Sequence, residues 1–188
     1  MRIAKTAIIV LFVISSFATY TGAAPQTGAG QGQAQDIWKP FRFFEGRWEG
    51  KGEGKPGISH GKQTWEFILR GRYLQVRNEA RFEPQGPNSA GELYEDFGII
   101  SYDKSRQKYV FRQFHVEGFV NQYVSDGPGA DGKAFVFVSE AIENIPAGFS
   151  ARLTYHILDD SSFEQTFDLA PPGQDLACYS KGVMKRVY

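Results

Sequence analysis

Cysteine is almost absent from this chain of 188 residues, in which Cys178 is the only thiol. A single cysteine cannot form an internal disulfide, so the fold must be stabilised by a hydrophobic core. Cys178 is itself expected to be a small buried apolar side chain rather than a reactive thiol. No cysteines and histidines have the spacing of zinc ligands, and no Asn-x-Ser/Thr glycosylation site occurs.

An excess of charge of one sign is also missing, because 21 basic residues balance 21 acidic ones. The basic residues form no stripe, which argues against nucleic acid as a partner. A nucleophile elbow, a phosphate-binding loop and a metal-binding motif are absent as well. The sequence therefore favours a binding protein over an enzyme, and it leaves the oligomeric state open.

The N-terminus has the pattern of an export signal. Arg2 and Lys5 precede an apolar run over residues 7–17, which is too short to span a bilayer comfortably. Small residues follow, so we predict a cleavable signal peptide over residues 1–23, with the cut near Ala23. The alternative is an uncleaved membrane anchor. With cleavage, the protein is secreted or periplasmic and keeps no stable membrane anchor.

The rest of the chain divides into a linker and one domain. Residues 24–36 are rich in Gly, Gln and Ala without apolar periodicity, which predicts a disordered linker. Residues 37–188 have the length of a single domain. That domain begins with an aromatic run, residues 38–44, which we expect to form a short helical lid.

The first expected strand has one large ring and alternating glycines. Gly46, Gly50 and Gly52 leave one face of this strand without side chains, as in a strand that bends to close a barrel. Trp48 lies among these glycines and would fill the barrel where its end narrows. We therefore assign all four residues to barrel closure.

Short alternating strands continue to the C-terminus. Their regular spacing indicates a sandwich or barrel, and consecutive hairpins favour an up-and-down barrel whose closure removes exposed edges. We predict an all-β fold, a ten-stranded antiparallel barrel with a short N-terminal helical lid. An eight-stranded barrel with two strands wrongly assigned is the alternative. The expected strands are 46–54, 62–69, 72–82, 92–102, 108–115, 119–125, 133–140, 149–158, 162–169 and 177–188.

The glycine motif at 46–52 and the terminal Lys-Arg-Val at 185–187 resemble the calycin barrels. These include the lipocalins, the fatty-acid-binding proteins and the nitrobindin-like haem-binding barrels. The glycine pattern is closest to the nitrobindin-like branch and its uncharacterised secreted relatives. The resemblance covers residues 37–188 and implies an up-and-down barrel with a lumen. It also implies that a basic residue of the last strand packs over Trp48; Arg186 is the first candidate and Lys185 the second.

Alternation along the expected strands predicts an apolar lumen with a few polar groups, which is typical of a small-molecule site. We predict a small hydrophobic ligand such as a lipid; the alternative is a structural barrel filled by its own aromatic side chains. Which of Glu95 and Asp96 faces inward stays open. The expected lumenal binding residues are Phe67, Leu74, Val76, Asn78, Phe111, Gln113, His115, Asn121, Tyr123 and Phe167.

His115 is the best candidate among three histidines for ligand binding or proton transfer, although a structural role is favoured. His60 and His156 are expected to face solvent. The nitrobindin-like resemblance implies a haem-ligating His on the last strand, and this position falls near Tyr179 instead. Alternation predicts that Tyr179 faces outward. We therefore predict no cofactor and no metal, with a haem protein or a calycin-type enzyme as alternatives.

Overall fold

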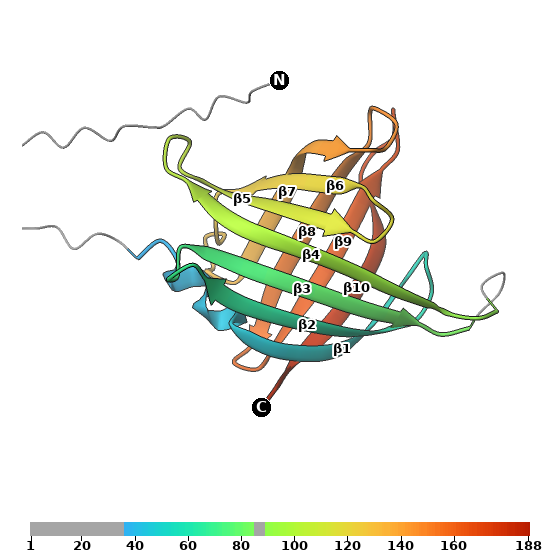
Figure 1. Ribbon diagram of the computed structural model, residues 1–188, viewed down its shortest axis with the longest axis horizontal. Helices are drawn as coiled ribbons and strands as arrows, with labels where there is room; N and C mark the ends of the chain where they lie inside the picture. Colours follow the sequence, from blue (N-terminus) through green and yellow to red (C-terminus); the bar gives the residue numbers. More distant parts are fainter. Residues whose placement is uncertain (1–35, 85–88) are drawn as a thin grey trace, which may run out of the picture. The chain divides into compact units, whose positions relative to one another are not determined.

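Residues 36–84 and 89–188 are described by a computed structural model. The predicted signal peptide, and the linker up to residue 35, lie outside the described residues. Ten strands form a closed antiparallel barrel in which each strand pairs with its neighbour in sequence and β1 pairs with β10 (Figure 1). The predicted ten-stranded barrel is confirmed, and the eight-stranded alternative is wrong. The elements are η1 (Lys39–Phe44), β1 (Gly46–Gly54), β2 (Ser59–Ile68), β3 (Tyr73–Phe82), β4 (Glu92–Asp103), β5 (Lys108–His115), β6 (Val120–Ser125), β7 (Ala134–Glu143), β8 (Ser150–Asp159), β9 (Ser162–Ala170) and β10 (Ala177–Val187).

Two strands are longer than predicted. β2 begins at Ser59, because this residue pairs with both Gly52 and Phe82 and so extends the ladder into a segment that resembles a loop in sequence. β7 continues to Glu143 because the β6–β7 ladder contains a register shift. Such a bulge adds a residue to one strand and breaks the strict alternation that predicts a strand.

The single cysteine does not lie where the sequence predicts. Cys178, predicted to be buried, is exposed. It lies near the start of β10, where the ladder shifts register between Cys178 and Ser180.

Within the described part of the chain, no helix has both the length and the apolar character needed to cross a membrane.

The short helix η1 fills the end of the barrel at which β1 starts (Figure 1). Its Phe41 and Phe44 are 1% and 0% exposed. The ring of Phe44 stacks on Trp65, with 4.9 Å between ring centres, and Phe41 packs on Tyr109 at 4.7 Å. The helical lid is therefore an aromatic plug that belongs to the core.

Arg186 and Trp48 connect this plug to the last and first strands of the barrel. Trp48 is fully buried, and its indole Nε1 donates a hydrogen bond to the Phe44 carbonyl at 2.7 Å. The Arg186 Cζ lies 4.2 Å from the centre of the Trp48 ring. Its guanidinium also donates to the carbonyls of Phe43 and Glu45, at 2.5 and 2.7 Å. One side chain of the last strand thus holds the lid and the first strand together.

Glycines allow β1 and β10 to approach each other. A Cβ at Gly50 would lie 2.0 Å from the Val183 carbonyl oxygen, and a Cβ at Gly54 would lie 2.2 Å from that of Tyr179. Both positions therefore require glycine for close backbone contact. At Gly52 the nearest atom to an added Cβ would be the Ser59 hydroxyl oxygen at 3.0 Å, a side-chain atom that can move.

Replacement of Trp48 by alanine should lower the free energy of unfolding by about 3–5 kcal/mol, because it removes a fully buried ring and leaves a cavity. Denaturant unfolding of the folded domain measures this change. Val136→Ala is the control, since Val136 is 38% exposed and should cost less than about 1 kcal/mol. A loss within about 0.5 kcal/mol for Trp48→Ala would contradict a structural role of the ring.

Candidate ligand-binding site

The interior of the barrel is filled near η1 and hollow away from it. Near η1, aromatic side chains pack against one another in a continuous cluster. Beyond them lies a cavity of about 460 Å³, within the usual range of small-molecule sites. The alternative of a fully self-filled barrel therefore describes only one end of the lumen. The buried aromatic residues are Trp38, Phe41, Phe44, Trp48, Trp65, Tyr109, Phe111, Tyr123, Phe135, Phe137, Tyr155 and Phe163.

Most of the cavity wall is apolar, with polar side chains gathered on β4, β5 and β6. Loop residues 117–119 and 145–149 complete the mouth. This combination of an apolar wall and a few convergent polar groups is typical of a ligand site. The apolar lining residues are Pro56, Phe82, Phe119, Ile142, Ile145, Pro146, Phe149, Ala151, Leu153, Phe167 and Leu169; the more polar ones are Glu92, Tyr94, Asp96, Gln113, His115, Glu117, Asn121, Tyr123, Gln165, Tyr179 and Ser180.

His115 is held on both of its ring nitrogens. Its Nε2 lies 3.1 Å from the Asn121 side-chain nitrogen, and its Nδ1 is hydrogen-bonded to the Tyr94 hydroxyl. With Asn121 as donor to Nε2, the imidazole proton belongs on Nδ1. The ring also stacks on Phe119 with 4.0 Å between centres. Burial lowers the pKa of His115 to about 4, so the ring is neutral at neutral pH.

Asp96 is an acidic side chain of β4 that borders both the cavity and a smaller hollow beside it. Its Oδ1 accepts hydrogen bonds from the side-chain amides of Asn78 at 2.5 Å and Gln113 at 2.7 Å. Burial raises its pKa to about 6, although the two amide donors act in the opposite direction. The surface that Asp96 keeps accessible borders the lumen.

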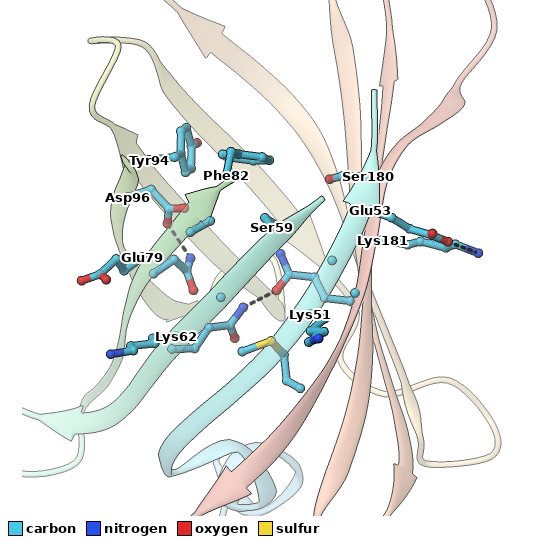
Figure 2. A pocket seen from close by; sticks show the side chains of 18 of the residues that line it. Lys51, Glu53, Ser59, Lys62, Glu79, Phe82, Tyr94, Asp96, Ser180 and Lys181 are labelled. Carbon is cyan, nitrogen blue, oxygen red and sulfur yellow. Dashed lines mark hydrogen bonds and ion pairs between the residues drawn. The ribbon is translucent and has the colours of Figure 1, made fainter. Parts of the chain in front are cut away.

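A smaller hollow of about 160 Å³ lies beside Asp96 (Figure 2). Gly52, Gly61 and Gly182 contribute to its wall, so the absence of side chains on β1, β2 and β10 leaves this space. Figure 2 shows Tyr94 and Phe82 on the same side of the hollow as Asp96. The glycine positions therefore also create space within the barrel.

Glutamines connect the aromatic plug to the cavity. The Trp65 indole Nε1 donates to Gln63 Oε1 at 3.0 Å, and Gln63 Nε2 donates to Gln165 Oε1 at 2.5 Å. Three buried polar atoms of the described residues have no hydrogen-bond partner, namely Asn78 Oδ1, Asn121 Oδ1 and the Tyr155 hydroxyl. An unpaired buried polar group costs about 1–3 kcal/mol, so Asn121 at the cavity and Asn78 at the smaller hollow favour an occupant that supplies partners, whereas Tyr155 lines neither space.

The structure separates the ten predicted lumenal residues into three groups. Five of them line the larger cavity: Gln113, His115, Asn121, Tyr123 and Phe167. Asn78 lines the smaller hollow.

The remaining four, Phe67, Leu74, Val76 and Phe111, line neither space. Phe67 packs on Trp38 at 5.7 Å, and the other three are fully buried. These four side chains face the interior as expected but lie in the plug, because alternation gives the face of a strand but not the height along the barrel axis.

Tyr179 is a correction of the opposite kind. It was predicted to face outward, but it lines the cavity and packs edge-on against Phe167, with 5.9 Å between ring centres. The register shift between Cys178 and Ser180 explains this reversal, because it interrupts the alternation so that the consecutive residues Tyr179 and Ser180 both line the cavity.

Asp96 and Tyr94 were not among the predicted binding residues. Asp96 lines the cavity, whereas its neighbour Glu95 is exposed. Ile100, Gly98 and Asp96 alternate along β4 and face inward. This alternation identifies Asp96 as a lumenal residue only when the register of β4 is known.

His115 does not fit a haem ligand, because both of its ring nitrogens already have hydrogen-bond partners. Tyr179 is then the remaining candidate haem ligand, and it stands near the position at which the nitrobindin-like resemblance implies a ligating residue. In the described ranges, no group of three or more His, Cys, Asp and Glu side chains could hold a metal ion.

Comparison with known proteins gives the fold alone. No family model matches the sequence, and no curated protein sequence matches it. Rv2717c from M. tuberculosis has a similar structure, with a TM-score of 0.63 and 14% identity, over 80% of this chain and 97% of that chain. A de novo designed fluorescence-activating β-barrel matches with a TM-score of 0.41 and 15% identity, over 77% of this chain and 94% of the design.

The pH dependence of stability tests the burial of Asp96. Because its folded pKa of about 6 exceeds the ordinary value of 3.8, ionisation is disfavoured in the folded state, and stability is lost as pH rises through this window. Asp96→Asn lacks this loss. Relative to wild type, its free energy of unfolding should therefore rise by up to about 3 kcal/mol between pH 4 and pH 7.

Denaturant unfolding at several pH values measures this difference, with the exposed neighbour Glu95→Gln as the matched control. His115 acts with the opposite sign, since its lowered pKa means that stability is lost as pH falls from 6.5 to about 4. The two effects partly offset each other in wild type. A difference between Asp96→Asn and wild type that does not change with pH would contradict the raised pKa of Asp96.

Proposed function

We propose that this protein binds a small, mostly apolar molecule in the lumen of its barrel. The observation that carries this proposal is the cavity of about 460 Å³, which has an aromatic and aliphatic wall and one cluster of polar groups. Its volume suits a small ligand. The aromatic plug stabilises the barrel from the other end, so the fold does not need the cavity to be filled by side chains.

The pairing of His115 favours a binding role for this ring over proton transfer. Both nitrogens of His115 and one carboxylate oxygen of Asp96 are engaged in hydrogen bonds within the barrel. A general acid or base needs a nitrogen or oxygen within reach of the substrate. His115 is therefore better suited to orient a ligand than to exchange protons with it, whereas Asp96 keeps one carboxylate oxygen available at the lumen.

The compartment is part of the proposal. The N-terminal pattern of a cleavable signal peptide, with the cut near Ala23, supports a secreted or periplasmic protein. A soluble carrier outside the cytoplasm would shield an apolar molecule from water. A lipid or another small hydrophobic compound is the ligand class that the wall favours; haem is less well supported because His115 has no free ring nitrogen.

Titration with the neutral dye Nile red, together with native mass spectrometry of the purified protein, tests this function. We expect saturable dye binding, or a co-purified small molecule. Leu169→Trp places a larger ring at the cavity wall and should weaken dye binding by about tenfold or more.

Thr166→Trp is the matched control on the same strand, because its partners Thr154 and Lys181 lie on the outward face. This variant should keep its affinity within about twofold. Absence of dye binding and of any co-purified molecule would overturn the proposed function. Equal loss in both tryptophan variants would instead place the dye outside the lumen.

A further inference from the structure

All charged side chains that line the cavity are acidic, and a lysine beside a lining residue, Lys55, has its ammonium 6.0 Å from the centre of the Tyr179 ring. Glu92, Asp96 and Glu117 contribute carboxylates, and neither Lys nor Arg occurs among the lining residues of the described chain. His115 supplies no positive charge at neutral pH because burial keeps its ring neutral. A ligand carboxylate or phosphate would therefore enter a low-dielectric space that contains like charges and no cationic partner.

Cationic residues near the smaller hollow do not change this balance. Lys181 pairs with Glu53 at 3.2 Å, and Figure 2 shows this pair extending away from Asp96. Lys62 is exposed, on the face of β2 opposite to the buried Gln63 and Trp65. Lys51 is exposed as well, on the face of β1 opposite to the buried Trp48. These ammonium groups belong to the outer surface of the barrel.

The unpaired polar atoms point to a ligand that donates hydrogen bonds. Asn121 lines the cavity and is 2% exposed; its amide nitrogen is bonded to His115 and Tyr123, and its Oδ1 has no partner. Asn78 Oδ1, beside Asp96, is unpaired as well. Both atoms are acceptors, so an occupant with N–H groups can satisfy them, whereas a carboxylate, which only accepts, cannot.

Aromatic rings complete this arrangement. Tyr94 and Tyr123 flank the polar cluster, and Phe119 covers His115 at the mouth. The faces of aromatic rings attract cations, more strongly where water is excluded. Carboxylates, unpaired acceptors and ring faces together form the surroundings that a buried ammonium group requires.

We propose that the lumenal ligand is an apolar molecule with a protonated amine, that its ammonium group binds at Asp96 and the Asn121 carbonyl, and that fatty-acid anions are excluded. This inference rests on the proposed function, since it names the ligand class of the same cavity.

Three compounds with the same apolar part test it: 1-naphthylmethylamine, 1-naphthylmethanol and 1-naphthoate, which are cationic, neutral and anionic at neutral pH. Calorimetric titration and displacement of Nile red measure their affinities. We expect the amine to bind about tenfold or more tightly than the acid, and more tightly than the alcohol, since hydrogen bonds to charged groups are the stronger ones.

Asp96→Asn keeps the shape of the side chain and removes its charge, so the ratio of amine to alcohol affinity should fall by about tenfold. Glu95→Gln removes a carboxylate from the adjacent exposed position and should leave this ratio unchanged. Equal or tighter binding of the acid, or an unchanged ratio in Asp96→Asn, would overturn the amine assignment and leave the proposed function intact. Nile red binding without binding of any naphthyl compound would overturn it as well. Failure of all three compounds and of Nile red would overturn the proposed function itself.

Discussion

The pairing of β1 with β10 is the constraint on which the rest of this structure depends. Closure brings two backbones so close that a Cβ at Gly50 or Gly54 would collide with a carbonyl oxygen of β10. Once the ladder closes, Arg186 lies opposite Trp48 and binds the carbonyls before β1. The lid is thereby attached to the last strand, and a closed sheet leaves no edge for further pairing.

Closure also explains how one barrel can be both stable and hollow. The lid inserts Phe41 and Phe44 into the lumen, where aromatic rings from several strands surround them. Burial of such rings supplies most of the favourable free energy that a small domain needs. Because this core occupies one end, the other end can hold a cavity of about 460 Å³ without loss of the fold.

The polar cluster at the boundary between plug and cavity has an unusual charge balance. Burial disfavours the charged form of both side chains: it keeps the His115 ring neutral, and it opposes ionisation of the Asp96 carboxyl group. Two amides offset part of this cost by donating hydrogen bonds to Asp96. This charge balance is the basis of the proposed preference for an amine, which the shape of the cavity alone would not provide.

Local sequence determined the strands and their faces. The alternation of single strands predicts the inward positions of Gln113, His115 and Asn121, and the glycine pattern around Trp48 predicts the first strand of a closed barrel. Only the tertiary structure decided the height of each side chain along the barrel axis. That height depends on the stagger between strands, which no single strand encodes, so Leu74 lies in the plug whereas Gln113 lies at the cavity. The bulge before Ser180 turned Tyr179 inward for the same reason: pairing with β9, rather than the local period of two, sets its direction.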